Sequence, residues 1–261
     1  MSQYTKRYNP DRHKDWNYGG SKWKLSRSKI ELYIECPRCF YLDNKLGTKR
    51  PSFPSFNLNN AVDELFKREF DVYRTKKEPH PLMTKYGIEA IPFEHKDLDT
   101  WRDSFVGITH YHDETGLTIS GGVDDVWIDS QDKLIVVDYK ATSKDGSIET
   151  LSDSPWETQY RRQMGVYQWL LQKNNFSVSS TGYFVYANAD QSREELANIL
   201  HFETTVLPCE GELSWIDKLL PMIKSCLESS MYPDSSPDCE YCLYRQSCGK
   251  KLQSIYADNK K

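Results

Sequence analysis

The chain has 261 residues, of which 38% are hydrophobic and 13% aromatic, which is enough apolar material for a sizeable core and argues against wholesale disorder. Its 34 basic and 38 acidic residues give a net charge of −4, which excludes a polybasic, histone-like protein but not a basic cleft for nucleic acid. The N-terminal residues show no secretory signal, and no apolar segment approaches the ~20 residues of a membrane helix. We therefore expect a cytoplasmic protein without a membrane partner.

The N-terminal segment has the opposite charge to the rest of the chain. Residues 1–29 hold eight Lys and Arg residues against two Asp residues, a net charge of +6. Composition alone predicts a basic, solvated and partly disordered arm over residues 1–25. Tyr and Trp residues are interleaved with its cations, so an arm that contacts phosphates is the alternative interpretation.

Helical periodicity follows the arm. A helix is predicted over residues 29–46, capped by Ser26 or Ser28, and a second over residues 58–74 with an apolar stripe on one face. The stretch 76–92 contains several prolines and is predicted to be an irregular crossing segment.

The periodicity then changes to that of strands. The patterns predict strands over residues 105–111, 117–128, 133–141, 182–188 and 201–207, with helices over residues 155–173 and 214–229. This order of elements is typical of an α/β domain with a mixed central sheet and helical additions at both ends.

Two of these strands carry the first candidate site. Asp138 and Lys140 follow the apolar run 134–137 and share one side of their strand, while Asp124 lies across a short turn on the preceding strand. An Asp-x-Lys pair alone is usually a surface ion pair, but this one ends the most apolar strand of the chain. Converging carboxylates repel unless a cation lies between them, and Mg²⁺ or Mn²⁺ prefers such oxygen ligands. Beside such a metal, Lys140 can orient a water or help to deprotonate it, and can stabilise a pentavalent phosphate, as phosphodiester hydrolysis requires.

The helix over residues 155–173 contributes polar side chains to the same region. Gln163 and Tyr167 are four residues apart and therefore share one face, with Tyr160 one turn earlier. They can hydrogen-bond the nucleophile, Lys140 or a phosphate. Viewed alone, the same residues also fit the polar edge of an ordinary amphipathic helix.

Two cysteine motifs lie near the ends of the chain. Cys36 and Cys39 form one C-x₂-C motif, and Cys239, Cys242 and Cys248 form a C-x₂-C-x₅-C motif predicted to lie in a short C-terminal loop. Paired motifs of this spacing indicate a metal site that ties the N-terminal helix to the C-terminus. In one model Cys36, Cys39, Cys239 and Cys242 hold a tetrahedral Zn²⁺, with Cys248 as the spare residue.

The ordered set of segments "SKIELYIECPRCFYLDNKLG", "GGVDD", "VVDYKAT" and "QMGVYQWLL", followed by the cysteine-rich end, resembles the PD-(D/E)XK nuclease superfamily. The similarity is greatest to its RecB-like branch, which includes CRISPR-associated and AddB-type exonucleases. It covers residues 26–250 as spaced motifs, so we expect a single nuclease domain there. Its parts would be a helical region over 26–100, a catalytic core over 101–210, and a C-terminal helix with the cysteines over 211–250, before a tail over 251–261.

The resemblance implies an αβββαβ core that cleaves DNA phosphodiesters with Mg²⁺ or Mn²⁺, in an exonuclease-like role in repair, recombination or defence. It implies that Asp124, Asp138 and the Tyr139 carbonyl hold the metal and that Lys140 acts on the water. Gln163 and Tyr167 match its Gln-x-x-x-Tyr element. It also implies a second cysteine model, in which Cys36, Cys239, Cys242 and Cys248 hold a [4Fe–4S] cluster and Cys39 is the alternative ligand. From the sequence we favour this iron–sulfur model, with structural Zn²⁺ as the alternative.

One position departs from the family pattern. RecB-like members carry a metal-binding His on an early helix, whereas the matching stretch here places Asp63 at that position. A carboxylate is still an oxygen ligand and makes the site more Mg²⁺-like. The departure also motivates the alternative that the protein is a catalytically lapsed, nucleic-acid-binding or structural subunit. Neither the polarity of cleavage nor a helicase or recombination partner is readable from the sequence.

Overall fold

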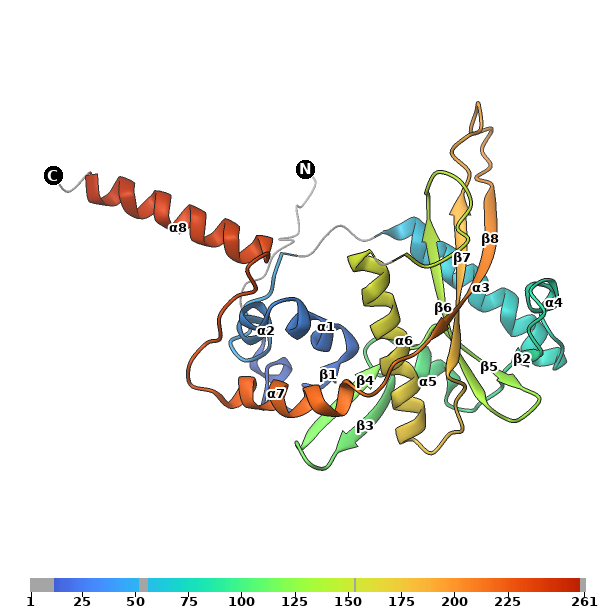
Figure 1. Ribbon diagram of the computed structural model, residues 1–261, viewed down its shortest axis with the longest axis horizontal. Helices are drawn as coiled ribbons and strands as arrows, with labels where there is room; N and C mark the ends of the chain where they lie inside the picture. The colour runs from blue at the N-terminus through green and yellow to red at the C-terminus, as the bar shows by residue number, and fades with distance from the viewer. Residues whose placement is uncertain (1–11, 52–55, 153, 259–261) are drawn as a thin grey trace. The chain divides into compact units, whose positions relative to one another are not determined.

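The computed structural model describes residues 12–51, 56–152 and 154–258 (Figure 1). The chain forms two compact units. One comprises Ser55–His112 and Thr118–Asp217, and is called the sheet unit below. The other comprises Met1–Pro54, Asp113–Leu117 and Lys218–Lys261, and is called the cysteine unit. The predicted class, a mixed α/β fold with helices at the N-terminus and a cysteine cluster near the C-terminus, is confirmed.

A mixed five-stranded sheet forms the centre of the sheet unit. Its order is β2 (Ala90–Pro92), β5 (Asp125–Asp129), β6 (Leu134–Thr142), β7 (Thr181–Ala189) and β8 (Phe202–Glu210). Strands β6 and β7 are parallel and the other neighbours are antiparallel. The parallel pair needs a crossover, which helix α6 (Pro155–Lys173) provides.

Helices cover both faces of this sheet, so β6 is buried on both sides (Figure 1). Helix α3 (Asn57–Lys76) packs Val62, Phe66 and Phe70 against the face that carries Tyr139. The ring of Phe66 stacks on that of Tyr139 with centroids 5.1 Å apart. Because side chains alternate along a strand, residues 138 and 140 face the opposite side, where α6 lies.

The strand predicted over residues 117–128 is wrong as a single element. It is divided into β4 (Leu117–Gly121), which pairs with β3 (Ile108–His112) in a second sheet, and β5. A Cβ atom at Gly121 would lie only 2.8 Å from Cε1 of Tyr167, so glycine permits the close approach of α6 there. The chain then changes sheets and brings Asp124 to the start of β5.

The segment 76–92 is also more regular than predicted. It contains the short helix α4 (Pro81–Lys85) and strand β2, and α5 (Leu98–Arg102) follows. Helix α4 begins with Pro81, whose missing N–H is no loss at this position, and the ring of His80 accepts a hydrogen bond from the N–H of Leu82.

The N-terminal part of the cysteine unit contains two short helices where the sequence predicts one. The chain forms η1 (Lys14–Trp16), β1 (Leu25–Ser26), α1 (Arg27–Glu35) and α2 (Pro37–Asn44). The predicted helix over 29–46 is therefore broken at Cys36, because Pro37 disfavours the helical conformation of the preceding residue, which adopts φ −161° and ψ 105°.

Part of the segment predicted as an arm, from Arg12 onward, contacts helix α2. Arg12 pairs with Asp43 at 2.7 Å, and the indole N–H of Trp23 donates to Asn44 at 3.0 Å, so both residues are tied to α2. Residues 1–11 lie outside the described residues. At the other end, α7 (Ile216–Glu228) is followed by α8 (Glu240–Asp258), so the cysteine motif predicted to lie in a loop starts a 19-residue helix instead.

Candidate active site and metal centre

Strand β6 and helix α6 bring together four of the predicted residues. Asp138 is 1% exposed and forms an ion pair with Lys140 through Oδ2. The amide Nε2 of Gln163 donates to Oδ1 of Asp138 at 2.8 Å and lies 3.0 Å from the hydroxyl of Tyr167. Both oxygens of the buried carboxylate are thereby engaged, and Gln163 holds it in one orientation.

Asp124 joins this group from β5. Its Oδ2 accepts a hydrogen bond from the backbone N–H of Tyr139 at 3.0 Å, which places the Asp124 carboxylate beside the part of strand β6 that carries Asp138 and Lys140. Burial, followed by the nearby charge of Asp138, raises the pKa of Asp124 to about 8, although the Lys140 ammonium acts in the opposite direction. The protein's own cations therefore do not fully neutralise this pair of carboxylates.

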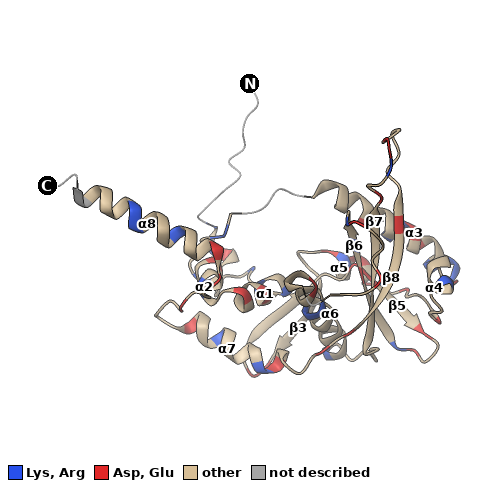
Figure 2. Ribbon diagram, turned by 45° about the horizontal axis from the view of Figure 1, so that its top comes forward, with Lys and Arg blue, Asp and Glu red and all other residues tan. Residues whose placement is uncertain are grey.

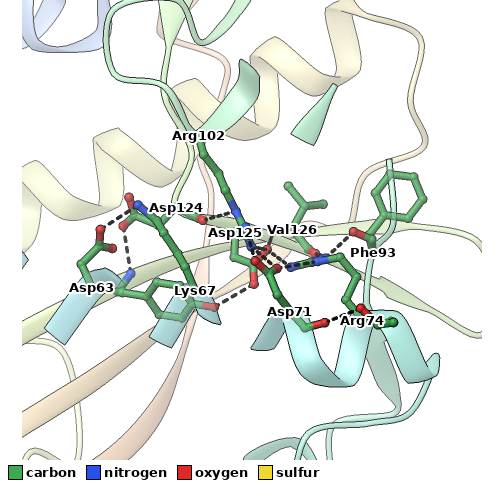
Figure 3. Close-up of polar contacts among 11 residues, drawn as sticks. Asp63, Lys67, Asp71, Arg74, Phe93, Arg102, Asp124, Asp125 and Val126 are labelled. Carbon is green, nitrogen blue, oxygen red and sulfur yellow. Dashed lines mark hydrogen bonds and ion pairs between the residues drawn. The ribbon is translucent and has the colours of Figure 1, made fainter. Parts of the chain in front are cut away.

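Asp63 approaches the same region from α3. Its Oδ2 forms an ion pair with Nζ of Lys67 at 2.6 Å, one helical turn along. Figure 3 shows the head group of Lys67 beside the carboxylates of both Asp63 and Asp124. Hydrogen bonding to Asp63 and the charge of Asp124 raise the pKa of Lys67 against the opposing effect of burial, which is the largest single contribution. Lys67 was missed in the sequence, although its i,i+4 spacing from Asp63 is a readable signal.

Larger cavities of about 490 and 730 Å³ lie elsewhere in the sheet unit, whereas the one lined by the predicted residues has a volume of about 330 Å³. It is lined by Asn59, Asn60, Val62, Asp63, Asp124, Tyr139, Lys140, Ala141, Tyr160 and Gln163. Asp138 and Tyr167 do not line it, but both contact Gln163, which does. We take the cavity of about 330 Å³ as the candidate active site because residues predicted from the sequence motifs line it, among them Asp124, Lys140 and Gln163.

Aromatic rings surround the ammonium group of Lys140. Its Nζ lies 4.6 Å from the ring centroid of Tyr160 and 5.6 Å from that of Phe184. A cation over aromatic faces is attracted by the ring quadrupole, so these rings restrain a flexible side chain next to the cavity. The position of Tyr160 one turn before Gln163 is the sequence signal for its role.

A buried network of ion pairs and hydrogen bonds around Asp125 holds the backbone of Asp124 in place (Figure 3). This network was not predicted from the sequence. Asp125 is fully buried and accepts hydrogen bonds from Arg74 at 2.5 Å, from Arg102 at 3.0 Å and from the Tyr139 hydroxyl at 2.7 Å. Arg102 also donates to the backbone carbonyl of Asp124 at 3.2 Å. Adjacent residues on a strand point to opposite faces, so Asp124 reaches the cavity while Asp125 anchors its backbone.

The second centre is a group of four buried cysteines in the cysteine unit. The ligand atoms of Cys36, Cys39, Cys239 and Cys242 all lie within 4.8 Å of one another. Three of the Sγ–Sγ distances are 3.6, 3.6 and 3.9 Å. These are the four residues of the zinc model. Cys248, which the iron–sulfur model needs, is not part of the group and lies further along α8 on a partly exposed position.

The environment shifts the pKa values of the thiols in opposite directions, because burial raises those of Cys39 and Cys242 while that of Cys36 is lowered. Burial acts against ionisation, but the backbone N–H groups of Cys39 and Ser236 lower the pKa of Cys36 to about 7. The guanidinium of Arg50 donates to Sγ of Cys239 at 3.5 Å and lies 4.6 Å from the ring of Tyr241. A cation of this kind offsets the negative charge that four thiolates bring to a divalent metal.

Comparisons with known proteins give a single family. Two solved structures resemble the fold weakly: "Crystal structure of SSO0001", with 14% identity, TM-score 0.40 and coverage of 85% of this chain and 84% of that one, and a "Putative exonuclease" from Eubacterium rectale, with 16% identity, TM-score 0.41 and coverage of 86% and 88%. A search of curated proteins found no match. None of the described helices is long and apolar enough to cross a membrane. The model of the PD-(D/E)XK nuclease superfamily matches residues 57–249, and the chain therefore belongs to that superfamily.

Proposed function

We propose that the protein is a metal-dependent DNA nuclease of the RecB-like type, which hydrolyses phosphodiester bonds in an exonuclease-like manner in DNA repair, recombination or defence. The observation that carries this proposal is the convergence of Asp124 and Lys140 at one cavity, with Asp138 directly beside them and an excess of negative charge. Membership of the nuclease superfamily supports the reaction class.

The donor set fits a hard divalent cation. Asp124, Asp138, the carbonyl of Tyr139 and Asp63 offer only oxygen ligands, which suit Mg²⁺ and Mn²⁺. The raised pKa of Asp124 supports the same assignment, since a carboxylate that is hard to ionise alone is stabilised by a divalent charge. When bound, such an ion lowers the pKa of a water and neutralises charge on the phosphate.

The protein side chains would orient the water, stabilise charge on the phosphate and position one another. Lys140 lines the cavity and, as an ammonium ion, would orient the attacking water, favour its ionisation through its positive charge and stabilise the pentavalent phosphate. Tyr160 would keep the Lys140 ammonium in place through its ring. Gln163 and Tyr167 would act as positioning residues, because Gln163 contacts Asp138 directly and Tyr167 contacts Gln163.

For the cysteine group, the distances support a structural Zn²⁺. A tetrahedral site with Zn–S bonds of ~2.3 Å has S–S edges of ~3.8 Å. The observed distances of 3.6 to 3.9 Å match this value. A [4Fe–4S] cluster binds its cysteines through four separate iron atoms and so needs more widely spaced thiolates. Its proposed fourth ligand, Cys248, also lies outside the group.

The nuclease proposal is tested with purified protein, Mg²⁺ or Mn²⁺, and labelled single-stranded DNA, double-stranded DNA and RNA. We expect metal-dependent cleavage of DNA that Lys140→Ala reduces by at least ~10²-fold, the range for loss of a group that stabilises charge in the transition state. Lys133→Ala, which removes an exposed cation at the opposite end of β6, is the matched control and should cleave normally. Equal cleavage by Lys140→Ala and the unaltered protein would refute the assignment.

A second candidate function rests on Asp63. Because this carboxylate stands where related enzymes carry a His and is already paired with Lys67, the chain would be a nucleic-acid-binding subunit that no longer cleaves. Stable DNA binding without cleavage, across several metals and substrates, would favour this function over the first.

A further inference from the structure

A second cation, Lys67, lies beside two residues that line the candidate active site, Asp63 and Asp124, and has no role in the proposed chemistry. Its Nζ is 2.6 Å from Oδ2 of Asp63, and the two side chains are 16% and 27% exposed. Its ammonium also attracts Asp124, and Figure 3 shows its head group beside both carboxylates. The pair is therefore not a solvated surface contact, which would be of little consequence.

The charges of the site are distributed in two pairs. Lys140 is paired with Asp138, and Lys67 is paired with Asp63 while also facing Asp124. Once Asp124 is ionised, as it would be when a metal ion binds, three carboxylates and two ammonium groups leave a single net negative charge in the site. The ion pair of Asp63 and Lys67 has no net charge, and a neutral imidazole at position 63 would also have none. Glu64, at the neighbouring exposed position, adds a weaker attraction for Lys67.

The position of Lys67 bears on how many metal ions the site can hold. Enzymes with two-metal sites keep the ions ~3.5–4 Å apart and need carboxylates to bind the second ion. Here the carboxylate available for that purpose is Asp63, because Asp138 is buried and engaged by Lys140 and Gln163. One oxygen of Asp63 is already bound to the ammonium, on the side that faces Asp124.

We propose that the Lys67 ammonium takes the place of a second divalent cation, so that the site binds one metal ion and Lys67 supplies the additional positive charge permanently. The inference rests on the proposed function, since it concerns the metal of the same site. It assigns to Lys67 a role in setting metal stoichiometry, and to Asp63 the role of orienting Lys67 as well as that of a ligand.

The test is the number of Mn²⁺ ions bound per chain, measured by titration with detection of free Mn²⁺ by electron paramagnetic resonance. This signal does not respond to zinc in the cysteine group. We expect one bound ion in the unaltered protein and two in Lys67→Met, which keeps the aliphatic stem but lacks the charge. Lys67→Arg keeps the charge and should bind one. Arg68→Met removes a cation from the next, exposed position of α3 and should also bind one.

A double variant separates charge from misfolding. In Asp63→Asn combined with Lys67→Met, the carboxylate needed by the second ion is absent, so the count should return from two to one. If the unaltered protein binds two ions, or if Lys67→Met still binds one, the inference is wrong while the nuclease proposal stands. If the unaltered protein binds none, the proposed metal site itself is wrong, and the inference is overturned with it.

Discussion

The buried network around Asp125 gives the sharpest prediction about stability. Replacing Asp125 by Asn keeps the shape of the side chain and removes its charge. Arg74 and Arg102 are then left largely buried, with Asp71 as their remaining carboxylate partner, at 2.9 Å from each. Two guanidinium charges would face one carboxylate in a region where water cannot compensate for the loss.

The expected magnitude follows from the burial of the partners. Asp125 is fully buried, and the side chains of Arg74 and Arg102 are 8% and 10% exposed. Removing one partner of such a buried pair costs ~3–5 kcal/mol in the free energy of unfolding. With a urea m-value of ~2 kcal/mol per M, the unfolding midpoint should fall by ~1.5–2.5 M.

Urea unfolding is followed by tryptophan fluorescence, to which the fully buried Trp127 of β5 contributes. Asp132→Asn is the matched control, because Asp132 is exposed in the β5–β6 turn and has φ +58°, a conformation that Asn also tolerates. The unfolding midpoint of this variant should stay close to that of the unaltered protein. A loss of less than ~1 kcal/mol in Asp125→Asn would show that the network is not a paired, desolvated cluster and would refute the reasoning.

Three further predictions concern the two centres. The pKa of Asp124 is raised to about 8 in the folded, metal-free protein. Between about pH 4 and pH 8 the folded protein therefore keeps a proton on Asp124 that the unfolded chain has released, so the free energy of unfolding should fall as the pH rises through this range. This loss should be suppressed by saturating Mg²⁺ and absent from Asp124→Asn, and thermal melts that show it unchanged in that variant would contradict the assignment. Tyr160→Leu should slow single-turnover cleavage ~2–5-fold, the equivalent of ~0.5–1 kcal/mol of cation–π attraction on Lys140, whereas Tyr160→Phe should not. Cys39→Ser should lose the zinc detected by mass spectrometry and Cys248→Ser should retain it; the reverse result would support the iron–sulfur ligand set instead.

The parts of the site that depend on local periodicity were predictable. Asp138 and Lys140 are two residues apart on a strand, and Gln163 and Tyr167 are four apart on a helix, so each pair shares a face whatever surrounds it. The bounds of α6 were also readable, since Pro155 starts the helix and the hydroxyl of Ser154 accepts from the N–H of Glu157 at 3.3 Å. The break at Cys36 had a local signal as well, in the proline that follows it.

Other features depend on contacts between residues far apart in the chain. One partner of Asp125 is Arg74, 51 residues away, and no local pattern distinguishes this arginine from the other cations of α3. The cysteine spacing allowed either Cys39 or Cys248 as the fourth ligand, and the packing of α2 against the start of α8 groups Cys39 with the other three cysteines. Spacing along a strand or helix determines which side chains share a face. Which faces meet depends on the burial and charge of the whole fold, and only the tertiary structure contains that information.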